Sequence, residues 1–199
     1  MKATLRTLRR FSCGRSTRIL GVVLILASCR ANGIDASAVA PISNDDTYAT
    51  LGYLWSGVKS SIEREREPST DTFSLALAFQ LPCARGGSGA YQGTLAGTKA
   101  NGIGTANLNV TATLAECQFD ESRITITRIS AAVLTVTGTV AIVNDAWDAI
   151  NLHMVATAVT VNGVACPGGV DVTLIGTSPS ASPVSTGTAC GRTGAVALP

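Results

Sequence analysis

The chain contains a single histidine, His153, so any acid–base or metal chemistry that needs an imidazole would depend on that one residue. A Ser-His-Asp or Cys-His arrangement requires the histidine beside a nucleophile, with a third group to orient it. His153 instead stands between Leu152 and Met154, in an alternating pattern that is typical of a strand. We therefore expect a solvent-facing or hydrogen-bonded structural histidine.

Paired carboxylates are the second candidate chemistry, because glycoside hydrolysis needs two acids held about 5–10 Å apart. The acidic clusters of the sheet-forming region are Asp120-Glu121 and Asp145/Asp148, and we expect both at solvated turns. The run Arg85-Gly86-Gly87-Ser88-Gly89 is rich in glycine but lacks the Gly-Lys-Ser/Thr ending of a phosphate-binding loop. The sequence thus predicts no catalytic residues, no cofactor and no enzymatic activity.

Threonine recurs at every second position in three segments: Thr111/Thr113, Thr125/Thr127 and Thr135/Thr137/Thr139. On one strand face these residues would form a ladder of hydroxyls and methyls, as an ice-binding or carbohydrate-facing sheet would use. The intervals lack the fixed repeat that a flat solenoid needs. The simpler interpretation is that threonine suits a solvated strand face.

The first residues have the parts of an export signal. Residues 1–18 are polar and cationic, the apolar run from Ile19 to Leu26 follows, and Leu26-Ala27-Ser28-Cys29 comes next. As a helix, so short a run spans only about half of a ~30 Å hydrocarbon core, which argues against a permanent transmembrane segment. We predict a signal peptide over residues 1–28.

The Leu-Ala-Ser-Cys sequence ending at Cys29 resembles the lipobox of bacterial lipoproteins. The resemblance implies cleavage between Ser28 and Cys29 and acylation of Cys29, for example with palmitate. Several acyl chains would then hold the domain on a membrane. Arg30 rather than aspartate follows, which implies the outer membrane if the cell is Gram-negative. The alternative is an ordinary secretory signal with a chance cysteine.

Four further cysteines, Cys83, Cys117, Cys166 and Cys190, follow in the mature chain. An even number in an exported protein predicts two disulfides, for which three pairings are possible. We favour Cys83–Cys117 and Cys166–Cys190, because each pair flanks a stretch that contains a hairpin. A four-thiolate zinc site usually needs Cys-x-x-Cys spacing, which is missing here, so no metal site is predicted.

The excess of positive charge belongs to the leader. Six of the fifteen Lys and Arg residues precede Ile19, and all thirteen acids follow Cys29, which leaves nine cations against thirteen acids in the mature chain. A domain with a net charge of 9 − 13 = −4 has no basic patch for phosphates, so we expect no nucleic-acid partner.

The mature chain divides into a tether and one domain. Residues 29–43 comprise the lipidated N-terminus and a flexible tether, and residues 44–199 form a single β-rich domain. A helix is predicted over residues 44–66, capped by Ser43 or Asn44. Its apolar stripe, which would pack on a sheet, comprises Tyr48, Leu51, Trp55, Val58 and Ile62.

From Thr72 onward the apolar residues alternate with polar ones, which is typical of strands with one buried face. Strands are expected over 73–81, 107–114, 124–127, 134–142, 149–161, 169–177 and 191–198. Reversals are expected at Lys99-Ala100-Asn101-Gly102, Asn144-Asp145 and Asn162-Gly163. The predicted fold is mainly β, an antiparallel curved sheet or partly open barrel of about 7–8 strands with the helix packed on it.

Beyond the leader, the domain resembles only uncharacterised envelope lipoprotein β-domains, and that resemblance carries over no functional residue. We expect a lipid-anchored structural or interaction module of the cell envelope, with an unidentified partner. The alternative is a carrier for a lipid or another small apolar ligand in the concave sheet. Small inward-facing residues, predicted at Ala76, Ala112 and Ala156, would leave room for such a ligand.

Overall fold

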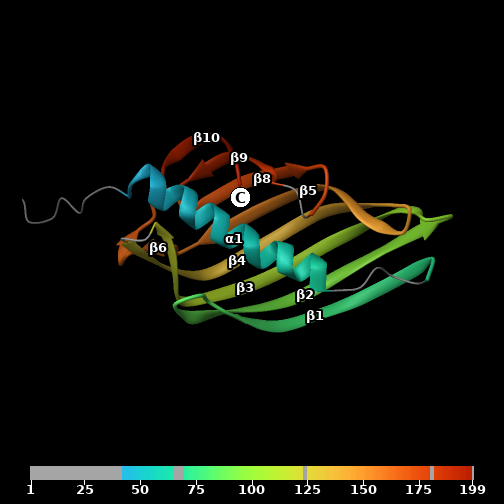
Figure 1. Cartoon of the computed structure of the whole chain (residues 1–199), viewed down its shortest axis with the longest axis horizontal. Helices are drawn as coiled ribbons and strands as arrows, with labels where there is room; N and C mark the ends of the chain where they lie inside the picture. The colour runs from blue at the N-terminus through green and yellow to red at the C-terminus, as the bar shows by residue number, and fades with distance from the viewer. Residues whose placement is uncertain (1–41, 65–69, 123–124, 180–181, 199) are drawn as a thin grey trace, which may run out of the picture. The chain divides into compact units, whose positions relative to one another are not determined.

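The computed structural model describes residues 42–64, 70–122, 125–179 and 182–198, which form one helix and ten strands (Figure 1). The predicted signal peptide, the cut site at Ser28, the lipidated Cys29 and the tether up to residue 41 lie outside these residues. The described part belongs to a single compact unit that begins at Val39.

Helix α1 (Asn44–Arg64) begins where the sequence predicts. Ser43 is its cap, because the backbone N–H of Asp46 donates to Ser43 Oγ at 3.0 Å. The Ser43 hydroxyl in turn donates to the Asp46 carboxylate at 2.7 Å, and both acids of the first turn lie at the positive end of the helix. The helix start is therefore capped by residues of its own first turn.

Eight strands follow one another across an antiparallel sheet in the order β1-β2-β3-β4-β5-β8-β9-β10, and a small β6–β7 hairpin pairs with β4. Their bounds are β1 (Thr72–Pro82), β2 (Gly86–Ala100), β3 (Ile103–Ser122), β4 (Thr125–Val143), β5 (Ala146–Thr157), β6 (Thr160–Val161), β7 (Val164–Ala165), β8 (Val170–Gly176), β9 (Val184–Ala189) and β10 (Arg192–Ala197). The sheet is open, because β1 and β10 form its two edges and do not pair with each other.

The prediction of 7–8 strands was wrong. Strands β2, β7 and β9 are absent from the predicted set, and the predicted strand over 149–161 is in fact β5 followed by β6. The two segments predicted over 124–127 and 134–142 are one strand, β4, whose pairing with β3 shifts register between Ala112 and Cys117. Such bulges bend a long strand without ending it, so they look like strand ends in the sequence.

The predicted reversals are confirmed as two-residue hairpin turns. Asn101-Gly102, Asn144-Asp145 and Asn162-Gly163 all have positive φ angles between 52° and 80°, the conformation of type I′ turns. A fourth turn of this kind, Cys190-Gly191, joins β9 to β10. Asn and Gly tolerate this backbone region best, which is why the first three turns could be predicted from the sequence.

The sheet curves around the helix, which crosses one of its faces (Figure 1). The rings of Phe73 on β1 and Trp147 on β5 lie 6.0 Å apart, although three strands separate them. In a flat sheet those strands would be about 19 Å apart, at ~4.8 Å per strand. The side of the sheet that faces the helix is called the inner face below. Its buried side chains and the apolar stripe of α1 form one core.

The helix residues that complete this core are Leu51, Leu54, Trp55, Val58 and Ile62, none more than 4% exposed. The packing of the helix on the sheet is therefore confirmed, with one correction. Tyr48 is 48% exposed, because the first turns of α1 lie over the short strands at the β10 edge.

Candidate binding surface

The structure joins the four domain cysteines as the sequence favours, Cys83 with Cys117 and Cys166 with Cys190. Cys83 directly follows β1 and Cys117 lies in β3, so this disulfide crosses over the start of β2. Cys166 follows β7 and Cys190 lies in the β9–β10 turn. All four are at most 7% exposed. Their role is to crosslink neighbouring parts of the sheet.

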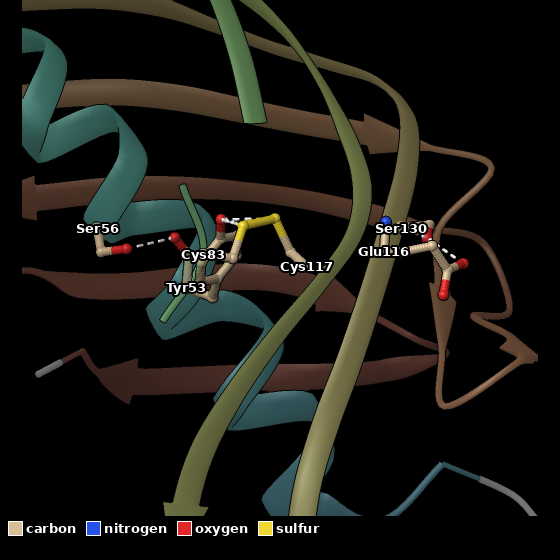
Figure 2. The surroundings of a disulfide bond; sticks show 6 residues. All are labelled: Tyr53, Ser56, Cys83, Glu116, Cys117 and Ser130. Atoms are coloured by element: carbon tan, nitrogen blue, oxygen red, sulfur yellow. Dashed lines mark hydrogen bonds between the residues drawn. A yellow bond between two sulfur atoms is a disulfide. The ribbon is translucent and has the colours of Figure 1, made fainter. Parts of the chain in front are cut away.

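Helix α1 reaches the first disulfide through Tyr53 (Figure 2). The Tyr53 hydroxyl lies 2.6 Å from Cys83 Sγ and 2.8 Å from Cys117 Sγ, so it donates to sulfurs that carry no proton of their own. Burial raises the pKa of Tyr53 to about 12. The hydroxyl is thus a neutral group that ties the helix to β1 and β3.

A second tyrosine, Tyr91 on β2, faces the middle of the helix. Its ring stacks on Phe79 of β1, with centroids 5.2 Å apart, and is 2% exposed. Its hydroxyl has no hydrogen-bond partner among the described residues. Burial raises the pKa of Tyr91, and the neighbouring Tyr53 raises it further. Neither tyrosine can be recognised from the sequence, because the contacts of Tyr53 with the disulfide and of Tyr91 with the helix arise only when α1 folds onto the sheet.

His153 lies on the outer side of β5, as the sequence predicts, and is hydrogen-bonded. Its Nε2 is 2.8 Å from Asp171 Oδ1 on the neighbouring strand β8. The two side chains are 52% and 66% exposed, so the pair is well solvated. Threonines flank the histidine at the same level on both sides, Thr137 on β4 and Thr173 on β8. The pair is thus part of a polar sheet surface.

The two acidic clusters are not arranged as predicted. Asp120 and Glu121 lie within strand β3, not at a turn, and their side chains are outside the described part. Asp145 is at the β4–β5 turn, as expected, but Asp148 is inside β5. Asp145 forms an ion pair with Lys99, whose side chain is only 8% exposed. That carboxylate therefore neutralises a buried ammonium group.

The glycine-rich run after Cys83 is also structural. Gly86 and Gly87 begin strand β2, and the backbone N–H of Arg85 donates to the carbonyl of Gln118 on β3 at 2.9 Å. An added Cβ at Gly87 would lie 2.2 Å from the carbonyl oxygen of Glu116. Glycine is therefore required there by the close approach of the two strands.

A polar cluster lies beside the Cys83–Cys117 disulfide (Figure 2). Glu116 has a positive φ of 50° at the bulge in β3, and its backbone N–H donates to Ser130 Oγ at 3.1 Å. Its carboxylate accepts from the same hydroxyl and lies 3.4 Å from the guanidinium Nε of Arg128. Glu116, Arg128 and Asn162 line a hollow of about 330 Å³. All three side chains are exposed, so water reaches the whole cluster.

The side of the sheet opposite the helix is called the outer face below, and it includes a few exposed apolar side chains, such as Val133 and Ile175. Its side chains are mostly threonine, asparagine, glutamine, serine and alanine. Representative members, in strand order, are Ser74, Ala78, Gln80, Gln92, Thr94, Thr98, Thr105, Asn107, Asn109, Thr111, Thr113, Thr135, Thr137, Thr139, Asn151, Thr157, Thr173, Thr186 and Thr188.

The strand register aligns these residues in rows that cross the sheet. One row comprises Thr94, Asn109, Thr137, His153, Thr173 and Thr186, on six neighbouring strands. Rows follow one another about 6.8 Å apart along the strands, and members of a row are about 4.8 Å apart. The predicted threonine ladders at 111/113 and 135/137/139 are part of this array, whereas the side chains of 125 and 127 are outside the described part.

A small groove of about 220 Å³ lies between the first turns of α1 and the strands β8 to β10. Tyr48, Ser185 and Arg192 are among its lining residues. The Arg192 guanidinium donates to the carbonyl of Ile42 at 2.8 Å, which fixes the chain just before the helix.

The chain has no significant match to a protein-family model, to a curated protein or to a solved structure. No helix formed by the described residues has the length and hydropathy needed to span a bilayer. Within the same residues, no three His, Cys, Asp or Glu side chains gather closely enough to hold a metal ion. The rows of hydroxyl and amide side chains make the outer face the candidate functional surface.

Proposed function

We propose that this protein is a lipid-anchored, non-catalytic binding module of the cell envelope, with the outer face as its binding surface. The observation that carries the proposal is the composition of that face. Rows of hydroxyl and amide side chains cross six strands, and the titratable side chains at the centre, His153 and Asp171, are hydrogen-bonded to each other. Such a surface has many hydrogen-bond donors and acceptors but little net charge.

An uncharged, hydroxyl-rich polymer matches this chemistry best, and we take a neutral polysaccharide as the partner class. Threonine hydroxyls and asparagine amides both donate and accept, as sugar hydroxyls do. A strongly charged partner would lack counter-charges on the outer face. An ice surface fits less well, because strands in a sheet rotate by roughly 20–25° from one to the next, and this twist breaks a flat lattice match.

The packing under the helix favours a binding module over a carrier. Trp55, Leu54 and Val58, each at most 1% exposed, occupy the space between α1 and the sheet, where a carried ligand would have to lie. Ala112 and Ala156 face inward, as the carrier hypothesis requires, and both are packed in the core. The prediction that Ala76 also faces inward was wrong, because this residue is exposed on the outer face.

The proposed anchor would leave the outer face accessible. Cys29 precedes Ile42 by 13 residues, which span at most about 45 Å when extended. Ile42 is buried in the core on the inner face, and the Arg192 guanidinium donates to its carbonyl. A module held in this way would be free to turn its outer face away from the membrane.

Affinity electrophoresis tests the proposal, with the full chain in detergent run through gels that contain a neutral or an anionic polysaccharide. We expect retardation by the neutral polymer. The variant Asn109→Glu/Thr137→Glu, which adds two charges to neighbouring positions of one row, should lose most of that retardation. Both positions are exposed, so the fold should be preserved.

The control is Ser56→Glu, on the exposed side of α1. Relative to its own mobility in a gel without polysaccharide, this variant should be retarded as much as the unmodified chain. Equal mobility with and without polysaccharide, or equal loss of binding in the control variant, would exclude the outer face as a glycan-binding surface.

A further inference from the structure

The edge strand β1 offers a long row of unpaired backbone groups. It has 11 residues, pairs with β2 without a register shift, and contains no charged side chain. No other described strand pairs with it. Proteins usually protect such an edge with charges, bulges or short length, because it can pair with another chain. Strand β1 has none of these protections.

The pairing pattern identifies which groups are free. The backbone N–H of Lys99 donates to the carbonyl of Asp71, which makes these two residues a hydrogen-bonded pair of the antiparallel ladder. Such pairs alternate along a ladder, so odd-numbered residues of β1 bond to β2. The even-numbered residues, Thr72, Ser74, Ala76, Ala78 and Gln80, direct their N–H and C=O groups outward. The carbonyl of Thr72 accepts one hydrogen bond, from the Thr70 hydroxyl at 2.9 Å, and its second lone pair can still accept another.

The sequence of β1 is nearly a palindrome about Ala76. Residues 73–79 read Phe-Ser-Leu-Ala-Leu-Ala-Phe, so Phe73 mirrors Phe79 and Leu75 mirrors Leu77. If a second copy of β1 pairs antiparallel about Ala76, Phe meets Phe and Leu meets Leu on the inner face. On the outer face, Ser74 meets Ala78. A two-fold symmetric interface needs this self-complementarity.

The position of Pro82 favours the same register. Pro82 is even-numbered and has no N–H, so it contributes no donor to the free edge. Pairing about Ala76 aligns Thr72 with Gln80 of the second copy and leaves Pro82 outside. All five outward N–H groups of each copy then find a carbonyl. Pairing about Leu77 would place Pro82 opposite Thr72 and lose a hydrogen bond at each end.

The core at this edge also has apolar surface left to cover. Leu75, Phe79 and Leu81 on the inner face of β1 are only partly buried, whereas their counterparts in the middle of the sheet are fully buried. The other edge strand, β10, is short, with 6 residues, and begins with Arg192. We propose that two copies of this chain associate through their β1 edges, antiparallel about Ala76, into one continuous sheet.

Cysteine crosslinking in the full chain tests both the association and its register. In Ala76→Cys, the two new thiols would lie on the two-fold axis, at a Cα–Cα distance of about 5.5 Å, which a disulfide can bridge. We expect a covalent dimer on mild oxidation, seen on a non-reducing gel. The matched controls are Ser74→Cys and Ala78→Cys, each alone, because position 74 faces position 78 of the second copy.

The single controls should give only the background dimer that the unmodified chain gives. A mixture of the two control variants should form a dimer through positions 74 and 78. If Ala76→Cys gives no more dimer than the controls, or if each control crosslinks alone as well as Ala76→Cys does, the proposal is overturned.

A charge exchange provides a second readout that needs no new cysteine. Ser74→Lys/Ala78→Lys places like charges opposite each other in the proposed interface, and we expect it to be monomeric in native mass spectrometry. Ser74→Glu/Ala78→Lys places opposite charges there, and we expect the dimer to return. Both side chains are exposed, so neither variant disturbs the core. A monomeric unmodified chain, or an open ladder of larger oligomers, contradicts the proposal.

Discussion

The ring of Tyr91 on β2 occupies the space where a side chain at position 57 of α1 would begin. A Cβ added to Gly57 would lie 1.9 Å from the Tyr91 hydroxyl oxygen and 2.5 Å from the ring carbon that bears it. Glycine costs a helix interior up to about 1 kcal/mol relative to alanine, so its presence here has a packing reason. The closest approach of helix and sheet depends on this pair.

We predict that Gly57→Ala destabilises the domain although alanine is the better helix former. Overpacking of a core usually costs about 1–3 kcal/mol, which exceeds the gain in helix propensity. The free energy of unfolding, measured in urea, should fall accordingly. Gly194→Ala is the control, because nothing lies within 4 Å of its added Cβ. A Gly57→Ala variant as stable as the unmodified chain would show that Tyr91 can move aside freely.

We predict that Tyr91→Phe raises the free energy of unfolding by about 1 kcal/mol. The hydroxyl of Tyr91 is buried without a partner among the described residues. Folding therefore removes its hydrogen bonds to water, and no hydrogen bond within the domain replaces them. Tyr53→Phe should have the opposite sign, because the Tyr53 hydroxyl contacts both sulfurs of the first disulfide. Thermal unfolding of the two variants side by side tests this difference in sign.

The pH dependence at alkaline pH follows from the same two tyrosines. Burial raises the pKa of Tyr53 to about 12 from an ordinary value of 10.0, and it raises the pKa of Tyr91 as well. Above pH 10 the unfolded chain loses these protons before the folded domain does. Stability is therefore retained below pH 10 and should fall as the pH rises toward 12.

Urea unfolding at several values between pH 9 and pH 12 measures this fall. The Tyr91→Phe variant removes one of the two titrating groups, so its curve should decline less steeply. An identical decline in the variant and in the unmodified chain would mean that other groups cause the alkaline loss.

The features that short-range patterns encode were predictable from the sequence. Ser43 and the acids after it fix the helix start, and Asn-Gly or Asn-Asp pairs fix three hairpins. The threonine ladder also followed from simple alternation. Its neighbours across the strands, such as Asn109 beside Thr137, could not be known before the strand order was known.

The features that sequence reading missed depend on contacts between distant segments. Strand β2 contains Gly89, Gly93 and Gly97, which in isolation indicate turns or loops. In the fold, an added Cβ at Gly93 would lie 2.0 Å from the carbonyl oxygen of Asn109, and at Gly89 it would lie 2.7 Å from the ring of Tyr91. These glycines serve close approach inside a strand. The need for glycine at these positions becomes clear only from the neighbouring side chains and strands in the fold.

We predict that Asp145→Asn destabilises the domain by about 1 kcal/mol, because it removes the counter-charge of the Lys99 ammonium at a site where the carboxylate itself is 57% exposed. The backbone at position 145 has a φ of 64°, a conformation that asparagine tolerates at least as well as aspartate. Any loss of stability in urea therefore reports the ion pair. Asp148→Asn removes an equal charge nearby and should change stability by less than the first variant.

Finally, we predict that each disulfide stabilises the domain by about 3–4 kcal/mol, through the entropy that a crosslink removes from the unfolded chain. The sequence separations of 34 for Cys83–Cys117 and 24 for Cys166–Cys190 give similar values, because the effect grows only with the logarithm of loop length. Cys83→Ala/Cys117→Ala should cost more than the entropic amount, since it also leaves the Tyr53 hydroxyl without its sulfur partners. Adding Tyr53→Phe to that variant should recover part of the difference, whereas adding it to Cys166→Ala/Cys190→Ala should not. Urea unfolding of the four variants measures the coupling, and the absence of any recovery would show that Tyr53 acts independently of the disulfide beside it.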